Sequence, residues 1–261
     1  MVFDPIPAAR ALRQIRVERG IVSRLPDGIR PTTDAEGAAV QRALADMQGA
    51  AAPYGFKIGA TGKRMQDYLG ISTPIAGFMR EQDVYRGHAD LRFADFVRPA
   101  VECEVAVRLA SDLPPGPCTL DQALAAVGEF FAGVEIVENR YADDLTDIGT
   151  PTILADQMYH CAAVIGDGHG LDWRAEKIGA LRGQISTNTG IADAGVTSDL
   201  QGHPLNGLAW LAGSAEAAAF GGLKAGQVVM LGSVTPPVWL SQPATVTVSF
   251  PSFPSVTVRF R

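Results

Sequence analysis

Two glutamates share one side of an apolar segment in the sequence VECEVAV, residues 101–107. The alternation predicts a β-strand, and positions 102 and 104 of a strand point to the same face. Two like charges would therefore lie about 7 Å apart on that face. An unpaired buried carboxylate costs several kcal/mol. The face is therefore solvated, neutralised by arginines, or occupied by a cation.

A second acid in a similar setting favours the cation. The segment AGVEIVENR, residues 132–140, places Glu135 inside another run of valine and isoleucine. Two such strands fit one site better than two unrelated accidents. Three carboxylates without a histidine or cysteine ligand suit Mg²⁺ or Mn²⁺ rather than Zn²⁺. An ion of this kind acts as a Lewis acid on carbonyl or enolate oxygens. Cys103, between the first two acids, points to the other face and is interpreted as a core residue.

Lys57 is the next candidate, in the strand-like segment YGFKIGA, residues 54–60. A lysine among apolar neighbours has a lowered pKa and transfers protons near neutral pH. The alternative is a surface lysine on an edge strand. The four histidines show no ligand spacing, so ordinary loop or packing roles are expected for all of them: His88, His160, His169 and His203.

The elements that position these residues can be read from the pattern. Two helices are expected first, over 6–20 and over 33–47, the second beginning with a capping box from Thr33 to Glu36. Further helices are expected around 63–70, from Thr119, and over 204–220. Beyond the segment at 54–60, strands dominate from residue 93, without regular β–α alternation, which favours an α+β fold with a mixed or antiparallel sheet. The expected strands are 101–110, 132–139, 160–166, 181–188, 227–232 and a terminal hairpin of 245–250 with 255–260.

Composition excludes several classes of protein. The chain has 261 residues, of which 47% are hydrophobic and 19% charged, an ordinary globular balance. Its net charge of −6 and the lack of a Lys/Arg run argue against a nucleic-acid partner. No apolar run approaches a membrane span, and three cysteines without metal spacing argue against a disulfide framework. We therefore expect a cytoplasmic protein with no membrane partner.

Six motifs in order resemble the 2-keto-4-pentenoate hydratase/2-oxo-3-hexenedioate decarboxylase family of the fumarylacetoacetate hydrolase superfamily. They are FKIG (56–59), ECE (102–104), VEIVENR (134–140), LADQ (154–157), GHPLNGLAWLA (202–212) and LKAGQVVMLGS (223–233). The resemblance covers about residues 10–261. It implies a mixed β-sheet roll with a helical N-terminal part, and a homo-oligomer. Residues 1–52 would form the helical part and 53–261 the catalytic β-roll domain, or the whole chain would count as one domain.

The resemblance also implies roles for single residues. Glu102, Glu104 and Glu135 match the family's three ligands for Mg²⁺ or Mn²⁺. Lys57 matches its proton-transfer and substrate-binding lysine, and Asp156 matches an aspartate next to the substrate carboxylate. Two further substrate-binding positions are expected in the matched motifs, at Gln157 and Ser233.

The implied reaction is lyase chemistry on small 2-oxo or 2-hydroxydienoic acids from aromatic catabolism. Chelation of the substrate's carboxylate and 2-oxo oxygens by the metal stabilises a dienolate while a proton moves. The first interpretation is hydration of 2-hydroxypenta-2,4-dienoate to 4-hydroxy-2-oxopentanoate.

Departures from the family pattern keep alternatives open. Ile75 stands where hydratases of the family commonly have an aspartate near the lysine, which favours 2-oxo-3-hexenedioate (4-oxalocrotonate) decarboxylation as the alternative. Bulky Met158 and Tyr159 replace small residues, so a diverged, non-catalytic 2-oxo-acid-binding protein is a further alternative. Acylpyruvate hydrolysis ranks third, because the sequence offers no obvious histidine to activate a water.

Overall fold

An eight-stranded mixed sheet forms the centre of the molecule. The computed structural model describes residues 2–169, 175–190, 192–251 and 253–261. The strand order is β2-β1-β10-β5-β6-β7-β3, with β11 paired to β5. The β1/β10 and β3/β7 pairs are parallel and the others antiparallel, which confirms the predicted mixed sheet. The strands are β1 (Gly55–Gly59), β2 (Ile75–Met79), β3 (Val84–Arg86), β5 (Pro99–Leu109), β6 (Val127–Glu138), β7 (His160–Ile165), β10 (Val228–Ser233) and β11 (Val238–Trp239).

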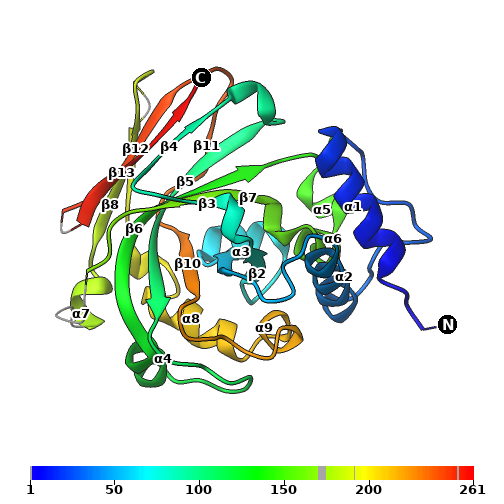
Figure 1. The fold of residues 1–261 in the computed structure, drawn as a ribbon, viewed down its shortest axis with the longest axis horizontal. Helices are drawn as coiled ribbons and strands as arrows, with labels where there is room; N and C mark the ends of the chain where they lie inside the picture. The colour runs from blue at the N-terminus through cyan, green and yellow to red at the C-terminus, as the bar shows by residue number, and fades with distance from the viewer. Residues whose placement is uncertain (1, 170–174, 191, 252) are drawn as a thin grey trace.

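A second, five-stranded sheet packs against the first one (Figure 1). Its order is β4-β13-β12-β8-β9. Antiparallel pairing of β12 with β13 confirms the terminal hairpin expected from the sequence. Its strands are β4 (His88–Leu91), β8 (Arg182–Thr187), β9 (Ala192–Val196), β12 (Thr245–Phe250) and β13 (Phe253–Phe260).

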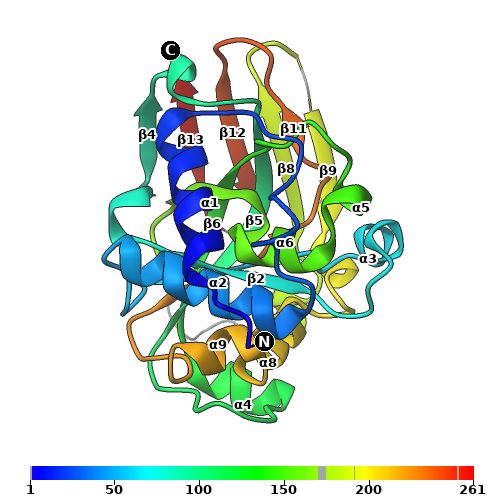
Figure 2. The same ribbon diagram turned by 90° about the vertical axis from the view of Figure 1, so that its right-hand side faces the viewer.

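The helices gather around the curled central sheet. Helices α1 (Ile6–Glu18) and α2 (Asp34–Met47) lie to one side of it with α5 (Leu145–Ile148) and α6 (Thr150–Ala155), as Figures 1 and 2 show. The expected capping box is present, because Thr33 and Glu36 bond to each other's backbone N–H at the start of α2. The remaining helices are α3 (Lys63–Leu69), α4 (Leu120–Ala126), α7 (Ala175–Ile178), α8 (Pro204–Ala212) and α9 (Ala215–Ala219). In the described parts of the chain, none of these helices is long and apolar enough to cross a membrane.

The structure corrects two expectations about the elements. The single helix expected over 204–220 is two helices, because the chain turns at Gly213 and Ser214 caps the start of α9. Strands also occur before residue 93: β2, β3 and β4 were not expected. These strands are only three to five residues long, and β2 is buried on both faces, so it shows no alternation of polar and apolar residues.

Alternation along the central strands divides their side chains between two environments. Phe56, Ile58 and Cys103 face the main hydrophobic core, which also contains Leu12 of α1 and Val40 of α2. Cys103 is fully buried, as expected. The opposite face carries a smaller apolar cluster, made of Met79, Ala106, Phe131, Ala163, Ile165, Val228 and Met230. Because the N-terminal helices share the main core, the division at residue 52 stays a prediction.

Candidate metal centre and active site

Three glutamates lie together on one face of the paired strands β5 and β6. Glu102 is directly opposite Glu135 in the antiparallel register, and Glu104 is opposite Gly133. Each side chain offers one carboxylate oxygen, and these oxygens lie within 4.8 Å of one another. Glu104 and Glu135 are fully buried, whereas Glu102 is half-buried. The structure therefore brings together the three acids that the sequence singles out.

Two of the buried carboxylate oxygens have no hydrogen-bond donor among the described residues. Oε2 of Glu104 accepts the Gly232 N–H at 2.9 Å, while its Oε1 accepts nothing from the described residues. Likewise, Oε1 of Glu135 is bonded to Lys57 and His160, and its Oε2 has no donor in the described part of the chain. A buried anionic oxygen without a partner is costly, and oxygen-only clusters of this kind are the preferred surroundings of Mg²⁺ and related cations. The donor set therefore fits a divalent cation.

The three acids differ in their electrostatic surroundings. Burial, reinforced by the charge of Glu135, raises the pKa of both Glu102 and Glu104. Burial also opposes the charge of Glu135, but the Lys57 ammonium and the hydrogen bond from His160 outweigh it and lower the pKa of that carboxyl. Glu135 is therefore ionised near neutral pH, and the other two carboxyls are not fully ionised before a cation binds.

Binding of a divalent cation is expected to release protons and to tighten as the pH rises through neutrality. The raised pKa of Glu102 and Glu104 means that the cation displaces protons from these carboxyls. Because their pKa is raised in the folded protein, the two carboxyls contribute stability to the metal-free fold that is fully present below the ordinary glutamate pKa of about 4.3. This contribution is lost as the pH rises through the raised pKa. Calorimetry in two buffers of different ionisation enthalpy measures the protons released, and release of none would contradict the expectation.

Lys57 reaches the cluster from β1, on the face opposite to Phe56 and Ile58. Its side chain is only 1% exposed. The Nζ atom lies 3.0 Å from Oε1 of Glu135 and donates to the carbonyl oxygen of Met158 at 2.9 Å. The ammonium is therefore fixed beside the carboxylates by two partners. Its place next to the acids agrees with the role expected from the sequence, which stays a prediction.

The segment after α6 is a buried left-handed turn. Gln157, Met158 and Tyr159 have φ angles of 57°, 48° and 66°, a region that side-chain-bearing residues rarely adopt. Each such residue costs about 1–3 kcal/mol and persists only where its surroundings impose it. Glycines in the neighbouring strands make room for the turn, since a Cβ on Gly59 would lie 2.7 Å from Met158 and one on Gly77 would lie 2.8 Å from Gln157.

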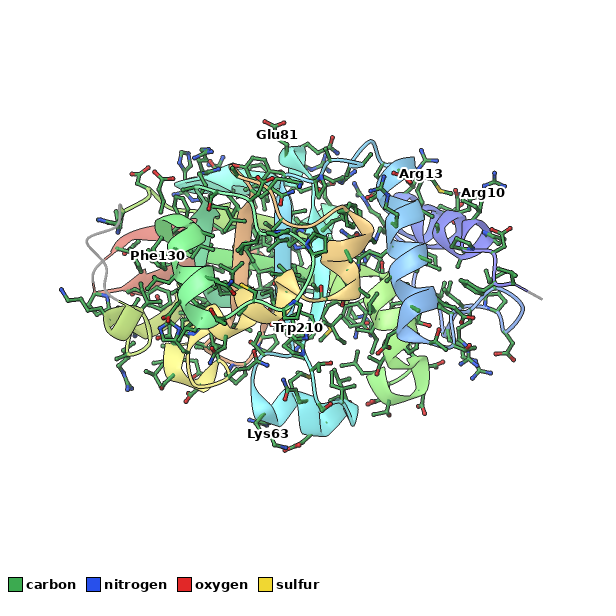
Figure 3. All side chains as sticks on the ribbon, turned by 90° about the horizontal axis from the view of Figure 1, so that it is seen from below. Arg10, Arg13, Lys63, Glu81, Phe130 and Trp210 are labelled. Atoms are coloured by element: carbon green, nitrogen blue, oxygen red, sulfur yellow. The ribbon has the colours of Figure 1, made fainter. Side chains whose placement is uncertain are left out.

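Arg16 of α1 fastens the two ends of this turn. Its guanidinium donates to the Asp156 carboxylate at 2.6 and 2.9 Å and to the His160 carbonyl at 3.1 Å. By contrast, Arg10 and Arg13 of the same helix are exposed and point away from the body of the molecule (Figure 3). The contacts described for Asp156 are thus with arginines and its own turn, and none joins it to the three glutamates or to the lysine.

The two further substrate-binding positions have different surroundings. The amide nitrogen of Gln157 donates to the carbonyl of Phe78 at 2.6 Å, and its Oε1 is buried without a partner among the described residues. Ser233 is paired in register with Glu104, but its hydroxyl donates to the Thr235 carbonyl at 2.7 Å. Oε1 of Gln157 is therefore available to a ligand, whereas the hydroxyl of Ser233 is already bonded to the backbone. Their contact with substrate stays a prediction.

Ile75 of β2 is paired in register with Gly59 of β1, belongs to an apolar cluster and is 2% exposed. It shares this cluster with Leu154 and Tyr159. A cavity of about 380 Å³ adjoins it, lined by Ile75, Leu154, Trp210 and Glu216 among others. The three glutamates and Lys57 do not line this cavity. The position where hydratases of the family commonly have an aspartate is therefore occupied by an apolar side chain that packs in an apolar cluster on one side and lines the cavity on the other.

His160 is the residue of the site that sequence reasoning missed. It begins β7, is 2% exposed, and its Nδ1 lies 2.9 Å from Oε1 of Glu135. Burial lowers its pKa, although the hydrogen bond to Glu135 opposes the shift. The packing role expected for this histidine followed from the lack of ligand spacing along the chain. Its position three residues after the LADQ motif was the one available signal.

Comparisons with known proteins place this geometry in a family. Residues 54–261 match the model of the fumarylacetoacetate (FAA) hydrolase C-terminal domain, and the chain therefore belongs to that family. Its relatives include hydratases and decarboxylases, as the ordered motifs predicted. The chain is 35% identical over 185 residues to a 2-hydroxyhexa-2,4-dienoate hydratase from Comamonas testosteroni, covering 70% of this chain and 68% of the relative. It is 26% identical over 207 residues to a 4-oxalocrotonate decarboxylase from Pseudomonas putida, covering 79% and 76%.

Solved structures confirm the predicted fold. The 4-oxalocrotonate decarboxylase from Pseudomonas putida G7, complexed with magnesium and adipate, superimposes with a TM-score of 0.88 at 23% identity, covering 98% of this chain and 97% of that one. The fumarylpyruvate hydrolase from Pseudomonas aeruginosa, in complex with Mn²⁺ and pyruvate, gives a TM-score of 0.56 at 13% identity, covering 78% and 88%.

Proposed function

We propose that this protein is a divalent-metal-dependent lyase acting on small 2-oxo or 2-hydroxy-enoic acids. One observation carries the proposal: two buried carboxylate oxygens, on Glu104 and Glu135, have no partner among the described residues and lie beside Glu102, next to the Lys57 ammonium. This arrangement provides a place for a cation and a proton carrier at the same point. The names of the relatives supply the class of substrate.

Glu102, Glu104 and Glu135 would hold Mg²⁺ or Mn²⁺, the ions present in the two related structures named above. When bound, such an ion supplies Lewis-acid stabilisation of negative charge on the oxygens of a 2-oxo acid. Burial of Lys57, Glu104 and Glu135 strengthens the charge interactions among them.

The protein's own groups would position the substrate and move the proton. Lys57 is held by Glu135 and the Met158 carbonyl, so its Nζ is a fixed proton donor or acceptor beside the substrate oxygens. Asp156, paired with Arg16, would act through the left-handed turn that carries the Met158 carbonyl. Its proposed role is therefore to orient the substrate-binding groups.

Hydration of 2-hydroxypenta-2,4-dienoate is the first candidate reaction, in keeping with the hydratases among the relatives. Decarboxylation of 2-oxo-3-hexenedioate is the second, favoured by Ile75. A buried isoleucine in an apolar cluster cannot exchange a proton with a water, whereas an apolar surrounding disfavours the charge of a carboxylate that is to be lost. Both reactions use the same metal and the same lysine.

The two activities separate in one experiment. Purified protein with Mg²⁺ is given each substrate, and formation of 4-hydroxy-2-oxopentanoate is followed beside release of carbon dioxide. We expect hydration, and release of carbon dioxide without hydration would replace the first candidate by the second. Metal-dependent binding of pyruvate with no turnover of either substrate would indicate a non-catalytic binding protein. The homo-oligomeric state and the cytoplasmic location stay predictions. Analytical ultracentrifugation measures the oligomeric state.

A further inference from the structure

The hydrogen-bonding pattern around Glu135 is asymmetric. Both nitrogen donors that contact it, Nζ of Lys57 at 3.0 Å and Nδ1 of His160 at 2.9 Å, lie on the same oxygen, Oε1. The second oxygen, Oε2, has none among the described residues. Two donors on one oxygen fix the plane of the carboxylate, so the free oxygen has a set direction. Lysine alone would leave the carboxylate free to rotate about that single contact.

The tautomer of His160 follows from its partner. Oε1 of Glu135 lies 3.0 Å from the Lys57 ammonium, which only donates hydrogen bonds, so this oxygen is an acceptor toward both of its neighbours. Nδ1 of His160 therefore carries the proton, and in the neutral ring Nε2 is an acceptor. That nitrogen is buried and has no donor among the described residues. A buried acceptor without a donor is unfavourable, so the site offers a place for an O–H group of a ligand.

The backbone holds the ring where it is needed. His160 directly follows the left-handed turn, and its carbonyl is bonded to Arg16. Its β7 neighbours are paired in register with β6, the strand that carries Glu135. The histidine is thus fixed from both sides, by a turn that is itself imposed by its surroundings and by a strand of the central sheet.

We propose that His160 is a positioning residue of this site, which holds Glu135 through Nδ1 so that Oε2 faces the cation, and which accepts a hydrogen bond at Nε2 from the 2-hydroxyl group of a bound 2-hydroxy acid. The inference rests on the proposed function, because it assumes that the three glutamates bind a metal and that the ligand chelates it. It adds a preference for the 2-hydroxy form of the substrate over the 2-oxo form. Groups that orient metal ligands in this way are worth about 10- to 100-fold in metal affinity.

The first test measures metal binding and needs no turnover. Calorimetric titration with Mg²⁺ is expected to show about 10- to 100-fold weaker binding for His160→Ala, and recovery of most of the loss in His160→Asn, whose amide can donate to Glu135 from the position of Nδ1. His169→Ala is the matched control, since its Nε2 also has no partner among the described residues, but its ring packs against Phe253 at a tilted angle, with the ring centroids 5.5 Å apart. Wild-type affinity in His160→Ala, or no recovery in His160→Asn, would overturn the positioning role. Absence of Mg²⁺ binding in the wild type would instead contradict the metal site itself.

The second test uses two probe ligands on the Mg²⁺-loaded protein. Lactate carries a 2-hydroxyl donor, and pyruvate has a 2-oxo oxygen in its place. We expect His160→Asn to bind lactate about five- to tenfold more weakly than the wild type, because it keeps no acceptor at the position of Nε2, and to bind pyruvate unchanged. Equal changes for the two ligands would overturn the contact at Nε2. A folding defect would weaken both ligands together, and so is distinguished from the predicted result.

Discussion

Glu104→Gln is expected to abolish the Mg²⁺-dependent binding of pyruvate, with a loss of at least about 100-fold in affinity for the ion. The substitution keeps the size of the side chain, and its amide oxygen can still accept the Gly232 N–H. What it removes is the negative charge on one of three ligands and the unpartnered oxygen that faces the cluster. The NH2 of the amide takes the place of this oxygen, and its N–H groups carry partial positive charge that repels a cation.

Calorimetry with Mg²⁺, and then with pyruvate in the presence of Mg²⁺, measures this effect. Glu129→Gln is the matched control: Glu129 lies near the start of β6, its side chain is 45% exposed, and it pairs with Arg108 at 3.1 Å. The control should bind both as the wild type does. Unchanged affinity in Glu104→Gln would refute the metal site.

Lys57→Met is expected to lower kcat by about 10²- to 10⁴-fold while the protein still binds Mg²⁺. Methionine fills much of the same space without the ammonium, so the proton carrier is lost. Because a positive charge is removed 3.0 Å from Glu135, the affinity for the cation should stay the same or increase. Loss of the hydrogen bond to the Met158 carbonyl is expected to cost about 1–3 kcal/mol of stability.

Steady-state kinetics and Mg²⁺ calorimetry on the same preparation separate these effects, and thermal melting reports the stability. Lys63→Met serves as the control, because Lys63 lies on the surface helix α3, is 80% exposed and pairs only with Asp67 among the described residues. Activity of Lys57→Met within tenfold of the wild type would rule out proton transfer by this lysine. Loss of metal binding would instead make its role structural.

The cluster of three glutamates could be predicted because its signal is local. Glu102 and Glu104 alternate with valines on one strand, and Glu135 interrupts a second run of the same kind. A period of two fixes which side chains share a face, so the pairing of the two strands is the one further fact that is needed. The capping box at Thr33 is predictable for the same reason, since all of its contacts lie within one helical turn.

The parts that the sequence did not reveal depend on contacts between distant segments. His160 reaches Glu135 across 25 residues, and Arg16 reaches Asp156 across 140. The left-handed turn at 157–159 contains no glycine, so nothing in its composition indicates its backbone conformation. The glycines that make room for the turn lie on the neighbouring strands, at positions 59 and 77. The spacing of residues along the sequence therefore cannot predict these contacts.

Arg16 joins two distant segments of the chain beside the candidate active site. Helix α1 lies outside the segment matched by the family model, which begins at residue 54, yet its arginine fastens the turn between Asp156 and His160. A fragment beginning at residue 54 would keep every proposed metal ligand and lose the group that braces the turn. A substitution in helix α1 can therefore change the position of the turn at 157–159, and with it the activity, while the proposed metal ligands stay the same.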